Sequence, residues 1–257
     1  DLTNASRTLI FNIRNKQWDE ELLKIFDIPV GILPKVQKSG SVFGKTNNKE
    51  TGLYDIPIAG VMGDQQAALY GQGCHASGTS KNTYGTGCFL VLNTAKRFVL
   101  SHKGLLTTLA CDAKGNPVYA LEGSVFIGGA VIQWLRDEVQ VIKNSGETEK
   151  VIKGLKDTNG IYIVPAFVGL GAPYWDSHAR GIVTGLTRGV NRRHLVRAAL
   201  EAIAYQTKDV FAVMEKEFGK KIHFLNVDGG ACQNDFLMQF QADILGRRII
   251  RPVMIDT

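Results

Sequence analysis

The chain has 257 residues and a formal net charge of +6, and 44% of its residues are hydrophobic while 21% are charged. These values exclude disordered, collagen-like and coiled-coil proteins, and they predict one or two folded domains with a sizeable core. The positive charge permits attraction to anions such as nucleotides but does not require nucleic acid.

The longest uncharged stretch runs from Thr158 to Trp175 and is broken by Pro165, Pro173 and three glycines, so no membrane span is predicted. No signal peptide is recognisable, and the missing initial Met gives the chain the look of an excised piece. The cysteines have neither a CxxC pair nor metal-type spacing, which favours buried free thiols in a reducing cytoplasm over disulfides or zinc.

The first elements predicted along the chain are a short helix over residues 18–26 and a strand over residues 56–62. Acidic residues in the first turn favour the helix, and residues 35–54 are rich in Gly, Ser, Asn and Lys, which indicates loop or edge structure. The apolar run 56–62 reads as a buried strand. It leads into GDQQAALYGQG (63–73), where Asp64 is expected at or next to the N-terminus of a short helix.

After Gly78 the pattern becomes that of short strands, predicted over residues 81–94, 105–110 and 118–121, with a reversal over 112–117. We therefore place a domain boundary near residue 75. A glycine-containing helix over 123–135, a charged segment and a broken strand and loop over 160–175 follow. A long helix from about Asn191, a strand over 224–227 and a helix over 236–245 complete the pattern, and the alternation predicts an α/β or mixed class.

One basic group stands out in the second half of the chain, at Arg188, Arg192, Arg193 and Arg197. Its spacing suits the exposed face of one helix, and no aromatic residues interleave with it, so a solvated face is favoured over a nucleic-acid patch. The five histidines are scattered, which argues against a zinc site.

Three glycine turns follow apolar runs, at residues 63–64, 85–87 and 229–231. Such turns present backbone N–H groups to anions and let a ligand approach the main chain. None is a Walker A loop or a G-x-G-x-x-G fingerprint, so P-loop kinases and Rossmann dehydrogenases are disfavoured. A phosphate site assembled from separated turns, in a cleft between two domains, remains.

Asp64 is the candidate general base. Transfer of a phosphoryl group to an alcohol needs a carboxylate that accepts the hydroxyl proton as the nucleophile attacks in line. The alternative is that Asp64 is only a helix N-cap, and the local sequence leaves both interpretations open.

Several strings resemble the FGGY family of carbohydrate kinases. They are residues 63–72, 81–93, 104–108, 167–176, 179–181 and 227–246, together with 3–8, 185–190 and 194–207. The resemblance runs along essentially the whole chain and is stronger to the glycerol-phosphorylating members than to the pentulose or gluconate kinases. It implies an α/β, actin-like or ribonuclease H-like two-domain kinase fold, truncated here at both ends. Residues 1–75 would be the C-terminal part of a glycerol-binding N-terminal domain, and 76–257 a nucleotide-binding C-terminal domain lacking its last helices.

The resemblance also implies roles for individual residues. Asp64 would be the catalytic base, would contact substrate and would lie near Mg²⁺, through water, while Gln65 and Phe89 would contact glycerol. The residues expected at the nucleotide are Gly85, Thr86, Gly87, Gly129, Gln133, Gly230, Ala231 and Asn234. Without the resemblance, Phe89 reads as core, Gln133 as helix surface and Asn234 as a helix cap.

The expected function is therefore ATP- and Mg²⁺-dependent phosphorylation of glycerol by a parent enzyme, with this piece alone inactive. Two alternatives stay open: another polyol or sugar kinase of the family, and a non-catalytic nucleotide-binding fragment. Glycerol and ATP or ADP are the expected partners. Neither nucleic acid nor a membrane is expected, and a homo-oligomer is left open.

Overall fold

The computed structural model describes residues 1–256 and is built around one six-stranded mixed sheet; Thr257, the last residue of the predicted second domain, lies outside the described residues. The strands lie in the order β12-β11-β5-β6-β8-β7. The first three run parallel, and β5, β6, β8 and β7 are antiparallel neighbours. Their bounds are β5 (Ser80–Tyr84), β6 (Cys88–Ala95), β7 (Leu106–Cys111), β8 (Pro117–Val125), β11 (Phe224–Asp228) and β12 (Arg248–Ile250). All six strands follow the predicted boundary at residue 75.

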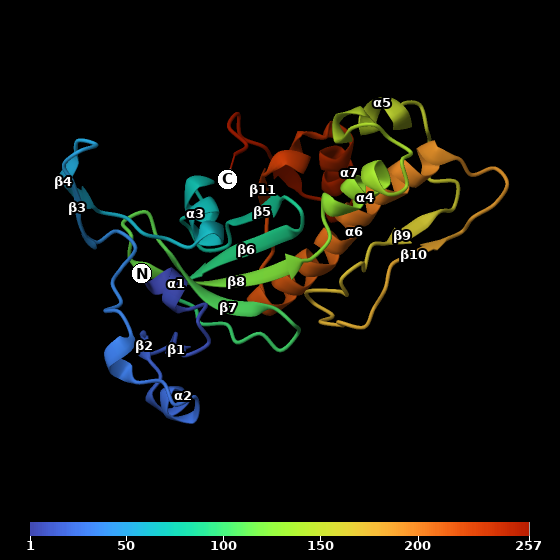
Figure 1. Cartoon of the computed structure of the whole chain (residues 1–257). Helices are drawn as coiled ribbons and strands as arrows, with labels where there is room; N and C mark the ends of the chain where they lie inside the picture. Colours follow the sequence, from blue (N-terminus) through green and yellow to red (C-terminus); the bar gives the residue numbers. More distant parts are fainter. Residues whose placement is uncertain (257) are drawn as a thin grey trace.

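One face of this sheet packs against the long helix α6 (Arg192–Phe218), with three further helices at the same end of the molecule (Figure 1). These are α4 (Ala130–Asp137), α5 (Thr148–Ile152) and α7 (Asp235–Leu245). Leu90 and Leu92 of β6 pack into the main core with Ile203 and Met214 of α6. The buried side of α6 includes Val196, Leu200, Ile203, Val210 and Met214. Thr207 is buried with them, and its hydroxyl donates to the Ile203 carbonyl.

The opposite face is covered by the short helix α3 (Asp64–Gly71). Successive residues of a strand point to opposite sides of a sheet. Val91, between Leu90 and Leu92, accordingly packs with Leu69 of α3 in a second cluster. α3 and α6 therefore lie on opposite faces of the sheet.

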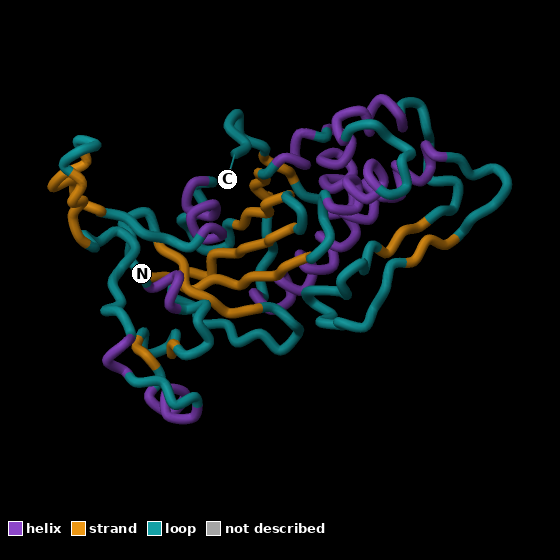
Figure 2. The backbone as a smooth tube through the Cα atoms, viewed as in Figure 1, coloured by secondary structure: helices purple, strands orange, loops and turns teal. Residues whose placement is uncertain are grey.

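The first 60 residues form small elements and long loops rather than a layer of their own (Figure 2). They are α1 (Leu2–Ala5), β1 (Phe11–Asn12), β2 (Gln17–Trp18), α2 (Glu20–Ile25), the 3₁₀ turn η1 (Val30–Ile32), β3 (Gly44–Asn48) and β4 (Leu53–Ile58). β3 and β4 pair only with each other, in a hairpin that projects from the sheet at the left of Figure 1. Further along, β9 (Tyr162–Val164) pairs with β10 (Ile182–Thr184). The 3₁₀ turns η2 (Ser145–Glu147) and η3 (Gly230–Gln233) complete the fold.

One predicted element is wrong, and two others have different bounds. The run 56–62 is not a buried strand: β4 ends at Ile58, and every residue of β4 is exposed because its only partner is β3. The predicted helix over 123–135 begins only at Ala130, because β8 extends to Val125 and pairs along its length with β6. The helix predicted over 18–26 forms as α2 with Glu20 and Glu21 in its first turn, but it is shorter: Trp18 belongs to β2, and Asp19 caps α2 by accepting from the Leu22 N–H.

The basic group of four arginines is only partly exposed to solvent, because two of its members bind other parts of the chain. Arg193 donates to the carbonyls of Val151 and Lys153. Arg197 donates to Glu201 and to the Leu155 carbonyl, and lies over the ring of Phe236. The carbonyl groups that end α5 and the following loop need donors, and these arginines supply them.

The α/β class is confirmed, as is the prediction for the cysteines: all four are buried and free. Burial raises the pKa of Cys88 to about 12 and that of Cys232 to about 11. In residues 1–256 no helix combines the length and apolar character needed to cross a bilayer.

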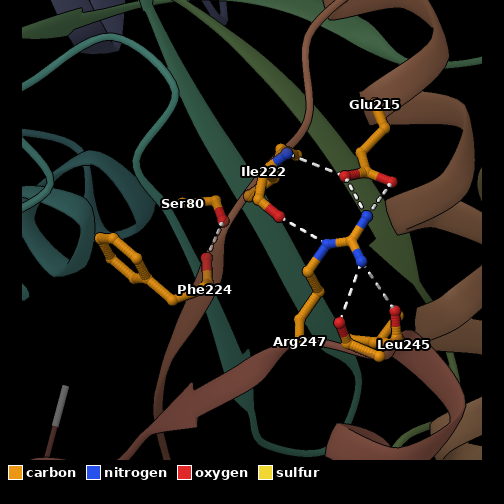
Figure 3. Close-up of polar contacts among 7 residues, drawn as sticks. Ser80, Glu215, Ile222, Phe224, Leu245 and Arg247 are labelled. Atoms are coloured by element: carbon orange, nitrogen blue, oxygen red, sulfur yellow. Dashed lines mark hydrogen bonds and ion pairs between the residues drawn. The ribbon is translucent and has the colours of Figure 1, made fainter.

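Arg247 ties together three elements at the β11–β12 end of the sheet (Figure 3). Its Nε donates to the Ile222 carbonyl at 2.6 Å, and Nη2 forms a 2.8 Å ion pair with Glu215 of α6. Nη1 donates to the Gly246 carbonyl at the end of α7. Glu215 also accepts from the Ile222 N–H at 2.8 Å, so one ion pair fixes the connection between α6 and β11.

We expect Arg247→Met to lower the free energy of unfolding by about 2–3 kcal/mol, because the partly buried Glu215 carboxylate and the Ile222 carbonyl lose their donors. Urea denaturation of the 257-residue chain measures this. Arg248→Met is the matched control, since Arg248 is exposed on β12, and it is expected to change stability by less than about 0.5 kcal/mol. Equal effects of the two substitutions would contradict this role of Arg247.

Candidate active site

A cavity of about 590 Å³ opens where β5 and β11 end, between α4, α6 and α7. Its lining includes seven of the eight residues predicted at a nucleotide: Gly85, Thr86, Gly129, Gln133, Gly230, Ala231 and Asn234. The eighth, Gly87, does not line it. The structure thus brings together residues from three separate parts of the chain.

The turn Gly85–Gly87 joins β5 to β6 and packs on the start of α4. The Gly129 N–H donates to the Gly85 carbonyl, and the Gly128 N–H to the Thr86 carbonyl, both at 2.8 Å. A Cβ on Gly87 would lie 2.4 Å from the Val125 carbonyl oxygen, so this glycine lets the turn approach β8. The Thr86 side chain is exposed and lines the cavity, free to meet a ligand.

The second glycine turn crosses the end of β5. Gly229 has φ 83° and ψ 160°, a conformation that is essentially restricted to glycine. A Cβ there would lie 2.6 Å from the Tyr84 carbonyl oxygen, whereas a Cβ on Gly230 would meet nothing within 4 Å. Gly229 therefore makes the contact between the two turns, and Gly230 leaves room in the cavity.

Asn234 combines the two roles that the sequence left open. Its side chain caps α7 by accepting from the Leu237 N–H at 2.8 Å, and it lines the cavity. Its amide nitrogen donates to the Thr148 hydroxyl at 3.0 Å, and the Glu149 carboxylate accepts from the Asp235 N–H. One wall of the cavity, which the sequence did not predict, is formed by Ser145, Gly146, Thr148 and Glu149. The only signal was a polar turn, and its contact with α7 spans 86 residues.

Asp64, Gln65 and Phe89 lie outside the lining of this cavity, toward the face covered by α3. Asp64 is the first residue of α3, and Gly63 occupies the N-cap, so the N-cap interpretation of Asp64 is wrong. The carboxylate is exposed, and its Oδ2 accepts from Gln65 Nε2 at 3.2 Å. An accessible carboxylate at a helix N-terminus can accept a proton from an approaching hydroxyl group.

α3 is fixed at both ends. The hydroxyl of the buried Thr3 accepts from the Gly63 N–H at 2.8 Å, just before Asp64. At the other end, Gln72 Nε2 donates to Asp228 Oδ2 at 3.1 Å, and Asn226 Nδ2 donates to the Gln72 carbonyl at 2.9 Å. The position of Asp64 is thus set by α1 on one side and by β11 on the other.

Phe89 is half-buried on β6, where it lies opposite Thr83 of β5 and Ser124 of β8. It alternates with the buried Cys88 and Leu90, which belong to the core on the α6 face, so its ring belongs to the α3 face. The interpretation of Phe89 as a core residue is wrong, because Phe89 is only half-buried and lies on the face of the sheet opposite the main core.

Lys81 is a buried cation beneath α3 that sequence reasoning did not single out. Its Nζ donates to Gln65 Oε1 at 2.5 Å and to Thr83 Oγ1 at 2.7 Å. Burial lowers the pKa of Lys81 to about 8, while the carboxylates of Asp228, Glu122 and Asp64 oppose that shift. Burial also raises the pKa of Glu122, against the effect of Arg7 at 3.3 Å. From the sequence, a lysine at the start of a predicted strand is expected to be exposed to solvent. Lys81 is buried because α3 covers it.

Family models match nearly the whole chain. The model described as the FGGY family of carbohydrate kinases, N-terminal domain, matches residues 1–71, and that of the C-terminal domain matches residues 80–256. A glycerol kinase from Clostridium botulinum is 59% identical over 257 residues, covering 100% of this chain and 51% of the relative. The chain thus spans about half the length of the curated relatives it matches.

Solved structures agree with this match. A Plasmodium falciparum glycerol kinase with ADP superimposes with a TM-score of 0.92 at 38% identity, covering 100% of this chain and 51% of that one. A xylulose kinase from Lactobacillus acidophilus superimposes with a TM-score of 0.88 at 26% identity, covering 100% and 52%. The predicted carbohydrate-kinase fold is confirmed.

The two adjacent glycines of the second turn give a matched test of the site's architecture. We expect Gly229→Ala to lower the free energy of unfolding by about 2 kcal/mol, because alanine neither tolerates this backbone conformation nor fits against Tyr84. Gly230→Ala is expected to be neutral within about 0.5 kcal/mol. Thermal and urea unfolding of both variants measure this, and equal stabilities would contradict the geometry of the turn.

Proposed function

We propose that the whole protein phosphorylates glycerol with ATP. The premise is that this chain belongs to the FGGY family of carbohydrate kinases. The observation that carries the proposal is the 59% identity to a glycerol kinase along the entire chain. Identity to the xylulose kinase of similar fold is only 26%, which makes another sugar kinase the weaker alternative. The products would be glycerol 3-phosphate and ADP.

The cavity would hold the nucleotide. Gly230, Ala231 and Asn234 would line the adenosine pocket, and Gly129 and Gln133 on α4 would contact the nucleotide from the other side. The turn Gly85–Gly87, with the Thr86 hydroxyl, would face the phosphates. This assignment is supported by the cavity, which gathers seven of these eight residues, and by the ADP in the P. falciparum relative.

The face covered by α3 would hold the acceptor. Gln65 would hydrogen-bond a glycerol hydroxyl, and Phe89 would pack its ring against the carbon backbone of glycerol. As the hydroxyl oxygen attacks the γ-phosphorus, the bond from phosphorus to the ADP oxygen breaks and Asp64 accepts the hydroxyl proton. Because the transition state of phosphoryl transfer is loose, little deprotonation of the hydroxyl group is needed before the attack.

Mg²⁺ is the expected metal. Among residues 1–256, no group of three or more His, Cys, Asp or Glu side chains could hold a metal ion. Proteins commonly hold Mg²⁺ through one or two carboxylates together with substrate phosphates. Asp64 would lie near the metal through a water molecule, and the ion would neutralise charge on the phosphates.

We also keep the domain boundary near residue 75 as a proposal. It is supported by the sheet, whose six strands all follow Thr79, and by the two family models, which meet between residues 71 and 80. Closure of the two domains would exclude water, which competes with glycerol for the phosphoryl group. A reducing cytoplasm stays a prediction, supported by the four free thiols.

The test is ATP-dependent phosphorylation of a panel of polyols and sugars by the full-length protein that contains this chain. We expect glycerol to have the highest kcat/KM. A preference for a pentulose or a gluconate would replace glycerol by another substrate of the family, and ADP binding without transfer to any acceptor would favour a nucleotide-binding module.

We expect Asp64→Asn in the full-length protein to lower kcat by at least about a thousandfold, because the amide cannot accept the hydroxyl proton. ATP affinity should stay within about threefold, since Asp64 lies outside the nucleotide cavity. Steady-state kinetics and ATP titration measure the two effects. Turnover close to wild type would refute the role of base.

We expect Gly230→Val to weaken ADP binding at least about tenfold, because the new side chain would occupy the cavity. Calorimetric titration of the variant measures this, with Gly71→Val as the control, since a Cβ at Gly71 also meets nothing within 4 Å and Gly71 does not line the cavity. Equal ADP affinities of the two variants would place the nucleotide elsewhere.

A further inference from the structure

Lys81 is a buried positive charge whose neighbours are arranged around one side-chain amide. The residue is 0% exposed, and it lies on β5 under α3. An isolated buried charge is costly unless hydrogen bonds satisfy it. In the part of the chain that the structure describes, Lys81 has no carboxylate within ion-pair distance, and its hydrogen-bond partners are the neutral Gln65 and Thr83.

These contacts fix the orientation of the Gln65 amide. A protonated lysine only donates hydrogen bonds, so the atom that faces Nζ at 2.5 Å must be the amide oxygen, Oε1. The NH₂ group is then directed away from Lys81. One of its hydrogens is donated to Asp64 Oδ2 at 3.2 Å, which leaves the second for another acceptor.

We propose that Lys81 is a positioning residue of the active site, which holds the Gln65 amide so that its NH₂ group faces both Asp64 and a substrate hydroxyl oxygen. This inference rests on the proposed function, because the hydroxyl is that of glycerol. If Lys81 were absent, the amide could turn over and present its oxygen to Asp64, where two acceptors would face each other. Lys81 acts only through Gln65 and touches neither nucleotide nor acceptor.

Thr83 completes the arrangement. Its hydroxyl accepts from Lys81 Nζ at 2.7 Å and lies on β5 directly opposite Phe89, the other proposed glycerol contact. Lys81, Thr83 and Phe89 therefore belong to one patch of the sheet. β5 and β6 therefore position both proposed glycerol contacts: Phe89 lies on β6, and Gln65 is held by Lys81 of β5.

The first experiment is a double-mutant cycle in the full-length protein, with Lys81→Met, Gln65→Ala and the double variant. Methionine fills a similar volume but cannot donate. We expect Lys81→Met to raise the KM for glycerol about tenfold and to leave the KM for ATP within about twofold. In the Gln65→Ala background, Lys81→Met should change the glycerol KM by less than about twofold, because the amide it orients is gone.

Lys220→Met is the matched control, since Lys220 is an exposed lysine beyond the end of α6, and its KM values should equal those of the wild type. A merely structural role for Lys81 would give effects that multiply in the double variant, or would disturb both KM values alike. Either result, or an unchanged glycerol KM for Lys81→Met, would overturn the proposal. Failure of the proposed function is separate, because the wild-type protein would then not phosphorylate glycerol at all.

A structure of the wild-type protein with glycerol tests the same point if Lys81→Met does not fold. We expect Lys81 Nζ within hydrogen-bond distance of Gln65 Oε1, and Gln65 Nε2 within hydrogen-bond distance of a glycerol oxygen. Direct contact between Lys81 and glycerol, or a Gln65 amide turned the other way, would overturn the proposal.

Discussion

The attachment of α3 to the sheet is the constraint on which the candidate site depends. α3 is short, and helices of eight residues have little stability of their own, so tertiary contacts must hold it. Its apolar contact is Leu69 against Val91 of β6, and its ends are tied by Thr3 and by β11. Because Asp64 is the first residue of this helix, these contacts determine where its carboxylate lies.

β5 links the two halves of the site, because its residues alternate between the faces of the sheet. Tyr84 is fully buried on the α6 side and donates to Gln241 of α7 at 2.8 Å, which anchors the helix that forms one wall of the cavity. Lys81 and Thr83 face the other side, under α3. One strand of five residues therefore supports both the proposed nucleotide pocket and the proposed acceptor site.

Much of this architecture could be predicted from the sequence, where local signals are strong. The long helix after Asn191 and the helix that begins at Asp64 have clear patterns and glycine boundaries, and both form. The prediction of a buried strand over 56–62 was wrong, because an apolar composition does not reveal whether other elements pack against the strand and bury it. The turns of the site were visible as glycines. The wall at Thr148 and the burial of Lys81 were not, since both depend on contacts between distant parts of the chain.

The β5–β6 hairpin carries Thr86 in its turn and Phe89 three residues later, with strand pairing to β8 fixing the register of β6. A strand rises by about 3.3 Å per residue, so the span between these two side chains is a property of the backbone and not of flexible loops. Inserting or deleting one residue here would move the side chains of β6 to the opposite face of the sheet. The proposed acceptor contact at Phe89 would then no longer lie on the α3 face. The proposed acceptor contact at Phe89 can therefore be altered by exchanging this side chain, but only while the length of the hairpin stays constant.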